Sequence, residues 1–297
     1  MKGLRLVFVI MGFILCIYIM SQVRELMIDK QEASLPVWKD LHNIELMAEL
    51  ENRMAVENQQ GSSLTGTGRK EDYTTLYPEL YATYDLPKKM PEGKKIAYLT
   101  FDDGPSENTY DILDILEEMD VKATFFIVGS SINKEREDCI KRMKYEGHAI
   151  GIHTYSHLCN EIYCSVERFL DDFNLVYQQL YEITGDRVNI FRFPWGSNNK
   201  YNKNIKDSLI EEMERRGFLC YDWSVDASDS IGRPTAYSIR HNIEKELMDQ
   251  EYPIILMHDS ASRNLTVRIL PGIIRMLKDK GYEFDTLNHR EPYKFEW

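Results

Sequence analysis

The sequence predicts an α/β fold in which a distorted barrel of about seven parallel strands follows a transmembrane helix and a helical stalk. From Lys95 onward, short apolar runs alternate regularly with stretches of helical periodicity, a pattern typical of a parallel sheet. About seven such units follow one another, enough to close or nearly close a barrel. Barrels of this kind carry their chemistry at the carboxyl ends of the strands, so functional residues are expected there.

Length and composition set the outer limits of the interpretation. The 297 residues are enough for one large domain with appendages, and the 43% of hydrophobic residues can fill a sizeable core. The net charge is −12, and no basic stripe occurs beyond the extreme N-terminus. Binding to a phosphate backbone needs clustered Lys and Arg, so we expect no nucleic-acid partner.

The N-terminal residues 1–21 are interpreted as a short cytoplasmic stub and a transmembrane anchor. The uncharged apolar run Leu6–Met20 follows Lys2 and Arg5. A removed signal peptide is the alternative, but the bulky residues Ile17–Met20 do not fit the small residues that cleavage requires, so the anchor is favoured. The basic residues should stay in the cytoplasm, which predicts a single-pass protein of the cell membrane with its main domain outside.

Two segments separate the anchor from the barrel. Residues 22–60 are predicted to form a helical stalk, because apolar residues recur there at helical spacing. The pattern is too irregular for a coiled coil, although self-association of the stalk is a possible role. Residues 61–94 form a linker rich in Gly, Ser and Thr and a lead-in to the domain. The barrel domain itself is assigned to residues 95–297.

The barrel elements follow from local patterns. The predicted strands span residues 96–101, 123–128, 148–152, 189–193, 218–225, 253–257 and 282–286. The predicted helices span residues 108–119, 134–145, 166–184, 204–216, 236–248 and 266–280. Gly147, Gly185 and Gly217 close three of these helices, a position at which glycine is favoured. Outside the anchor, Cys159 and Cys164 are close enough to pair, and buried free thiols are an equally good interpretation of the cysteines.

Polar residues gather at the ends of the predicted strands. They are Asp102, Asp103, His153, His157, Arg192, Asp226, Asp229, His258 and Asp259. The spacing of His153 and His157 places both imidazoles on one side of a helix or tight turn, within reach of one metal. A carboxylate would complete a catalytic zinc site with an open position. Neighbouring Asp102 and Asp103 point different ways along an extended segment, so one can bind metal while the other acts as a base. A plain turn at these two residues is the weaker interpretation.

Five segments in order make the pattern specific. They are Thr100–Pro105, His153–His157, Arg192–Gly196, Trp223–Asp229 and Leu256–Asp259. Together they resemble the five ordered motifs of the polysaccharide deacetylase family, also described as the NodB-homology domain or carbohydrate esterase family 4. The resemblance covers roughly two-thirds of the chain, from the first strand of the barrel to the last.

The resemblance implies a metal site. It implies that Asp103, His153 and His157 hold one divalent metal, with Zn²⁺ as the first choice and Co²⁺ or Ni²⁺ as alternatives. It assigns Asp102 the role of general base and His258 that of general acid.

Supporting roles are implied in the same way. Arg192 should lie against Asp102 and keep it ionised, and Asp229 should favour the protonated form of His258. The backbone N–H of Trp195 should stabilise the oxyanion.

One position departs from the family pattern. The family usually has Trp after Asp229, where this chain has Ser230. In the family that Trp, with the residue corresponding to Leu256, forms a wall around the acetyl methyl group, and Pro194 is expected to line the same pocket. The departure leaves acyl selectivity open.

The resemblance implies a metal-dependent hydrolase that removes N-acetyl groups from a cell-wall glycan, with N-acetylglucosamine of peptidoglycan as the first choice. Alternatives are a deacetylase or esterase acting on chitin oligomers, xylan or an exopolysaccharide. A catalytically silent wall-binding module is the alternative from another class.

Overall fold

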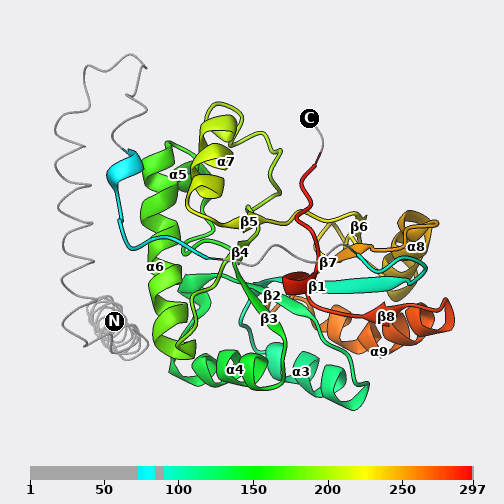
Figure 1. The fold of residues 1–297 in the computed structure, drawn as a ribbon. Helices are drawn as coiled ribbons and strands as arrows, with labels where there is room; N and C mark the ends of the chain where they lie inside the picture. Colours follow the sequence, from blue (N-terminus) through cyan, green and yellow to red (C-terminus); the bar gives the residue numbers. More distant parts are fainter. Residues whose placement is uncertain (1–72, 84–89, 296–297) are drawn as a thin grey trace, which may run out of the picture. The chain divides into compact units, whose positions relative to one another are not determined.

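The computed structural model describes residues 73–83 and 90–295 (Figure 1). The predicted anchor and stalk, residues 1–21 and 22–60, lie outside the described residues. Within the described ranges, no helix combines the length and apolar character that a membrane span needs. Every element described below belongs to one compact unit, which lies within residues 68–297.

A parallel sheet forms the centre of this unit and confirms the predicted α/β class. Its strands lie in the order β5-β4-β3-β2-β1-β7-β6. A short eighth strand, β8, pairs in parallel with the first residues of β1. The strands are β1 (Ile96–Gly104), β2 (Thr124–Ile127), β3 (Ala149–Ile152), β4 (Ile190–Phe191), β5 (Leu219–Cys220), β6 (Val225–Asp226), β7 (Ile254–His258) and β8 (Glu283–Phe284).

The predicted single strand at 218–225 is wrong, because this stretch holds two strands at opposite edges of the sheet. β5 pairs with β4, and β6 pairs with β7. Between them, Asp222 donates its N–H to the Tyr293 carbonyl and not to a strand of the sheet. Arg192 binds two carbonyls there: its Nε lies 2.7 Å from the Tyr221 carbonyl oxygen and its Nη2 lies 3.0 Å from the Asp222 carbonyl oxygen. The two edge strands of the sheet, β5 and β6, are therefore consecutive in the chain, and the sheet curls into an incomplete barrel.

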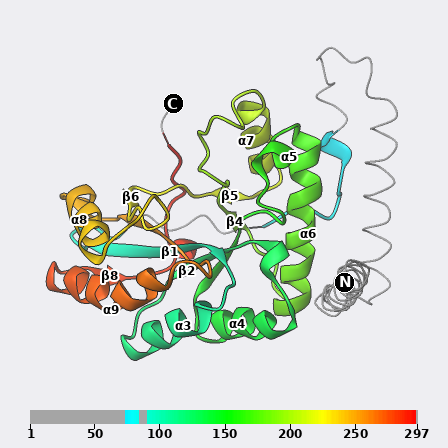
Figure 2. The same ribbon diagram turned by 180° about the vertical axis from the view of Figure 1, so that it is seen from behind.

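Helices cover the outside of the curled sheet. Five of them, α6, α4, α3, α9 and α8, follow one another, each in contact with the next, as Figures 1 and 2 show from opposite sides. The helices are α3 (Thr109–Glu118), α4 (Lys134–Tyr145), α5 (Cys159–Ile162), α6 (Val166–Thr184), α7 (Lys206–Arg215), α8 (Ala236–Leu247) and α9 (Asn264–Asp279). Single 3₁₀ turns are η1 (Tyr73–Thr75), η2 (Gly129–Ser131) and η3 (Leu287–His289). Helix α5 was not predicted, because four residues are too few to show helical periodicity.

Local capping explains where the helices begin and end. The Ser165 hydroxyl accepts the Arg168 N–H at the start of α6, and Gly185 ends that helix with φ +74°. Thr235 and Ser238 form a reciprocal capping box at the start of α8. Such side chains satisfy backbone N–H groups that have no partner within the helix. These two helices therefore begin and end close to the predicted residues.

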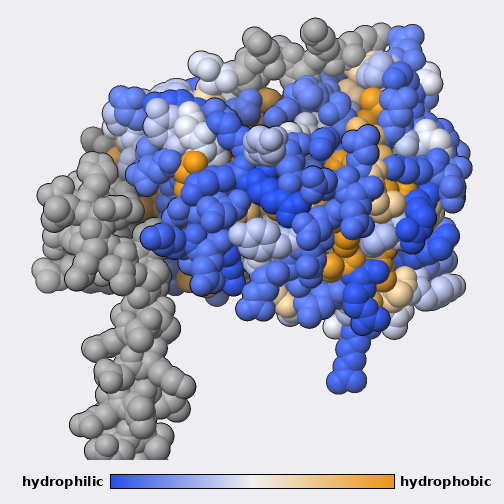
Figure 3. Space-filling view, turned by 90° about the horizontal axis from the view of Figure 1, so that it is seen from below, coloured by the Kyte–Doolittle hydropathy of each residue, from blue (hydrophilic) through white to orange (hydrophobic). Residues whose placement is uncertain are grey.

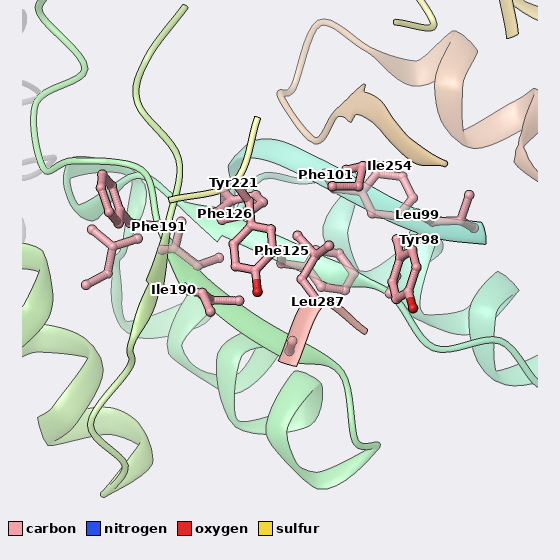
Figure 4. Close-up of a cluster of buried hydrophobic side chains, with 14 of the residues drawn as sticks. Tyr98, Leu99, Phe101, Phe125, Phe126, Ile190, Phe191, Tyr221, Ile254 and Leu287 are labelled. Atoms are coloured by element: carbon pink, nitrogen blue, oxygen red, sulfur yellow. The ribbon is translucent and has the colours of Figure 1, made fainter. Parts of the chain in front are cut away.

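The core lies between the sheet and the helices. From Ile96 to Asp102 every residue of β1 is buried, as expected for a parallel strand covered on both faces. The rings of Phe101 and Phe125 stack with centroids 5.2 Å apart. Figure 4 shows this cluster, including Tyr98, Leu99, Phe126, Ile190, Phe191, Tyr221, Ile254 and Leu287. The face of the molecule that Figure 3 shows is mostly hydrophilic, with apolar side chains in patches between the polar ones.

The segment of residues 73–82 is tied to the barrel by one buried arginine. Arg216 is fully buried, and its guanidinium donates to the carbonyls of Tyr73, Leu76, Tyr77 and Leu80. Its charge is balanced by Glu212, which lies 2.7 Å away. Gly217 follows with φ +83°, and a Cβ there would lie 2.2 Å from the Ala82 carbonyl oxygen. Only glycine fits at this close approach.

Candidate active site

The polar residues predicted to lie at strand ends do meet at one edge of the sheet. Asp102 and Asp103 belong to the last part of β1, and His258 ends β7 directly beside Asp102 in the register. His153 follows β3, and Arg192 follows β4. Because the strands are parallel, their carboxyl ends face the same side, which brings residues distant in sequence together.

Asp103, His153 and His157 form a compact cluster of metal-ligand types. One ligand atom from each lies within 4.8 Å of the others. The Oδ1 atom of Asp103 lies 3.4 Å from Nε2 of His157 and 3.7 Å from Nε2 of His153. Nδ1 of His153 lies 2.8 Å from the Arg192 carbonyl oxygen, which fixes the ring with Nε2 toward the cluster. These two imidazoles and one carboxylate, with the His153 ring held by its hydrogen bond to the Arg192 carbonyl, fit a divalent metal.

The backbone around the cluster is strained. Asp103, Thr154 and His157 have φ values of +72°, +67° and +57°. Non-glycine residues rarely adopt this left-handed region unless their surroundings hold them there. Asp172 of α6 provides part of that support, because its carboxylate accepts the backbone N–H groups of Tyr155 and Ser156 between the two histidines.

Asp102 is held by a buried arginine. Oδ1 of Asp102 lies 2.8 Å from Nη1 of Arg192, which also donates to the Thr100 hydroxyl. The Arg192 guanidinium lies 4.2 Å from the centre of the Phe126 ring. Burial raises the pKa of Asp102, whereas the charge of Arg192 lowers it by less, so the net pKa lies above the usual value for Asp. The contact with Arg192 is as expected, but burial outweighs its effect and makes Asp102 a stronger base.

His258, next to Asp102 on the neighbouring strand, is paired with Asp229. Nδ1 of His258 lies 2.7 Å from Oδ1 of Asp229, whose Oδ2 accepts the backbone N–H of His258 and the hydroxyl of Thr266. Burial lowers the pKa of His258, but the bond and charge of Asp229 raise it by more, to about 9. By contrast, burial and the nearby His157 lower the pKa of His153 to about 3. His258 is therefore cationic near neutral pH and His153 neutral, as a metal ligand must be.

The predicted pocket residues lie around this cluster. The Trp195 side chain is 47% exposed, and its ring centre lies 4.6 Å from that of His157. Leu256 is buried in β7, two residues before His258. Pro194 precedes Trp195, and its carbonyl accepts the hydroxyl of Tyr163.

Ser230, the position that departs from the family pattern, follows Asp229 and is partly buried. Its carbonyl lies 3.3 Å from Nη2 of Arg263 in the loop after β7. The backbone of this position is therefore tied to the neighbouring loop, while its small side chain carries no ring.

Sequence reasoning gave no role to two carboxylates that support the site. Asp259 is buried and accepts the hydroxyls of Ser106 and Thr109, and a Cβ on Gly104 would lie 2.5 Å from its Oδ2. Asp172 lies within helix α6, and the sequence pattern of that helix does not indicate that Asp172 binds the loop between the two histidines. Oδ1 of Asp226 accepts the Ser228 N–H in the loop before Asp229.

The four cysteines in the described residues do not belong to the clustered Asp and His side chains. Cys139, Cys159, Cys164 and Cys220 are all free thiols. Burial raises the pKa of Cys139 and that of Cys220, which keeps both protonated. The open choice between a Cys159–Cys164 disulfide and free thiols is resolved in favour of free thiols in this structure.

A curled parallel α/β barrel with a buried carboxylate, a cationic imidazole and a cluster of His and Asp at the carboxyl edge has the arrangement of a barrel enzyme. Residues 89–213 match the family model described as polysaccharide deacetylase. The chain is also 37% identical over 206 residues to a putative polysaccharide deacetylase, YheN, of Bacillus subtilis, covering 68% of this chain and 70% of that protein. The chain belongs to the polysaccharide deacetylase family.

Two further relatives point to the same family. A peptidoglycan-N-acetylglucosamine deacetylase of Bacillus cereus is 32% identical over 206 residues, which cover 67% of this chain and 71% of that protein. The crystal structure of the catalytic domain of peptidoglycan N-acetylglucosamine deacetylase from Eubacterium rectale superposes with a TM-score of 0.65 at 32% identity. That match covers 73% of this chain and 97% of the solved domain, so the similarity extends over the whole barrel.

Proposed function

We propose that this deacetylase depends on a divalent metal and removes N-acetyl groups from N-acetylglucosamine in peptidoglycan. The observation that carries the proposal is the meeting of Asp103, His153 and His157 beside Asp102 and His258. The peptidoglycan substrate is supported by the similarity to the deacetylases of Bacillus cereus and Eubacterium rectale.

The three clustered residues would hold the metal. Two imidazoles and one carboxylate form a donor set that suits Zn²⁺ with an open position, and Co²⁺ and Ni²⁺ are the alternatives. When bound, the metal would acidify the attacking water and polarise the acyl oxygen.

Two neighbouring residues, Asp102 and His258, serve as base and acid. Asp102 is buried against Arg192 and accepts the proton of the attacking water, for which its raised pKa is suited. His258 is kept protonated by Asp229 and donates that proton to the departing amine. The backbone N–H of Trp195 would donate to the oxyanion that forms when water adds to the acyl carbon.

Product analysis tests this function. The purified protein is incubated separately with peptidoglycan, chitin oligomers and acetylated xylan, and acetate release and sugar masses are measured. Loss of acetyl from the glucosamine of peptidoglycan is the expected result. Preferential loss from chitin or xylan would favour another glycan, and binding to walls without any acetate release would favour the silent module.

Asp229→Asn should move the alkaline limb of the activity profile to lower pH. His258 must be protonated to act as an acid, so wild-type activity should fall as pH rises through about 9. Without the Asp229 charge, the pKa of His258 should drop toward its ordinary range, near 6.5. The measurement is kcat against pH, with Asp226→Asn as the control. An unchanged alkaline limb would remove His258 from the role of acid.

Ser230→Trp should raise the preference for N-acetyl over N-propionyl substrates. A ring at this position would narrow the space beside the acyl methyl, and one methylene is worth about 1–3 kcal/mol of selectivity. The ratio of kcat/KM values is compared with that of Ser262→Trp, an exposed serine in the loop after β7. An unchanged ratio would mean that another residue, such as Tyr155 or Trp195, builds the wall.

We further propose that residues 1–21 anchor the chain in the cell membrane with the deacetylase domain outside. The proposal rests on the apolar run after Lys2 and Arg5 and on the bulky residues Ile17–Met20. N-terminal sequencing of the protein from membranes should show that residues 1–21 are retained. A mature start near Ser21 or Gln22 would show that the segment is a removed signal.

A further inference from the structure

The turn after β4 has an unusual backbone. Trp195 and Gly196 have φ values of +64° and +82°, so two successive residues lie in the left-handed region. Glycine adopts this conformation freely, but Trp does so only when its surroundings compensate for the strain. The N–H of this same Trp195 is the one assigned to the oxyanion.

A buried carboxylate holds the far side of the turn. Asp222 is fully buried, and its Oδ1 accepts the Ser197 N–H at 2.8 Å. Oδ2 accepts the Ser197 hydroxyl and, at 2.7 Å, the N–H of Phe295. One side chain therefore connects the turn to the segment of residues 293–295, which is about a hundred residues away along the chain.

That segment also packs on the turn. The Phe295 ring meets the Trp223 ring edge to face, with centroids 4.9 Å apart. A Cβ on Gly196 would lie 2.7 Å from Cε2 of Phe295, so the aromatic ring covers the glycine closely. The segment is fixed at Tyr293, whose carbonyl accepts the Asp222 N–H at 2.7 Å.

We propose that Asp222 and Phe295 are positioning residues for the oxyanion donor: together they hold the Trp195–Gly196 turn in its left-handed conformation. The proposal rests on the function proposed above. Both residues act through the turn, and neither is a ligand in the clustered set of Asp103, His153 and His157. Their loss should therefore lower turnover without lowering metal content.

Kinetics of the full chain test the proposal. Phe295→Ala and Asp222→Asn should each lower kcat by about 10-fold or more, since loss of a whole oxyanion donor costs about 10²–10³-fold. KM and metal content should stay within about twofold of the wild-type values. Phe295→Leu, which keeps an apolar side chain over Gly196, should restore most of kcat. Lys294→Ala is the matched control, because Lys294 pairs with Glu214 on α7.

A double-variant comparison separates positioning from general destabilisation. Gly196→Ala should lower kcat through contact with the Phe295 ring, and adding Phe295→Ala should cost less than the two single effects combined. Additive losses, losses equal to that of Lys294→Ala, or losses that follow metal content would overturn the proposal. Thermal unfolding identifies variants that fail to fold; if Asp222→Asn is one of them, Phe295→Ala and Phe295→Leu decide. Wild-type protein inactive on every acetylated glycan would instead reject the proposed function.

Discussion

Asp102→Asn should lower kcat by about 10²–10⁴-fold while leaving metal binding intact, because a general base contributes about that factor. Asn keeps the shape of Asp and an oxygen that can accept the Arg192 hydrogen bond, which is 2.8 Å long here. It cannot accept the proton of the attacking water. Turnover and metal content are measured on the same purified sample, so that loss of the base is separated from loss of the metal.

Asp103→Asn provides the contrast. The two carboxylates are nearly equidistant from His153: Nε2 lies 3.6 Å from Oδ2 of Asp102 and 3.7 Å from Oδ1 of Asp103. Their surroundings differ, since Asp102 is buried against Arg192 whereas the Asp103 side chain is 30% exposed and also faces His157. Asp103→Asn should therefore weaken metal binding. Equal metal content in the two variants would show that the assigned division of roles is wrong.

Removal of the metal should abolish acetate release. A chelator should leave protein without measurable turnover, and added Zn²⁺ should restore it, because the residues alone supply no strong electrophile for the acyl oxygen. Elemental analysis should find one metal per domain. Full turnover in protein confirmed to be metal-free would reject the metal-dependent mechanism.

Histidine variants connect this result to the cluster. His157→Gln should lower metal affinity, whereas His241→Gln should leave it unchanged, because His241 lies on the exposed face of α8 against Tyr237. Affinity is measured by competition with a coloured chelator, which does not depend on activity. Equal affinities in the two variants would exclude His157 as a ligand.

The parts of the fold that depend on local pattern were predictable. Helices α4 and α6 span the predicted residues, since their apolar periodicity and their capping residues agree. The division of residues 218–225 into β5 and β6 was not predictable. That stretch is largely apolar, with only Asp222 and Ser224 polar, and the distant Arg192 side chain binds two carbonyls in its middle. A local pattern cannot record a partner that lies far away in the sequence.

In the site, too, some residues could be predicted from the sequence and others could not. The motif residues could be found because they lie next to strands, and the structure brings Asp103, His153 and His157 together as predicted. Asp172 and Asp222 could not be found, because each acts on the backbone of another loop through contacts that only the tertiary structure creates. Their own neighbours in the sequence carry no sign of that role.

Arg216 determines how the deacetylase domain can be excised for expression or calorimetry. A fragment that starts at Lys95, where the strand–helix alternation begins, would lack the carbonyls of residues 73–80 that its guanidinium binds. Each buried donor left without an acceptor costs about 1–3 kcal/mol, a large share of the free energy of unfolding of a typical domain. A fragment that begins at or before Tyr73 should therefore be more stable than one that begins at Lys95.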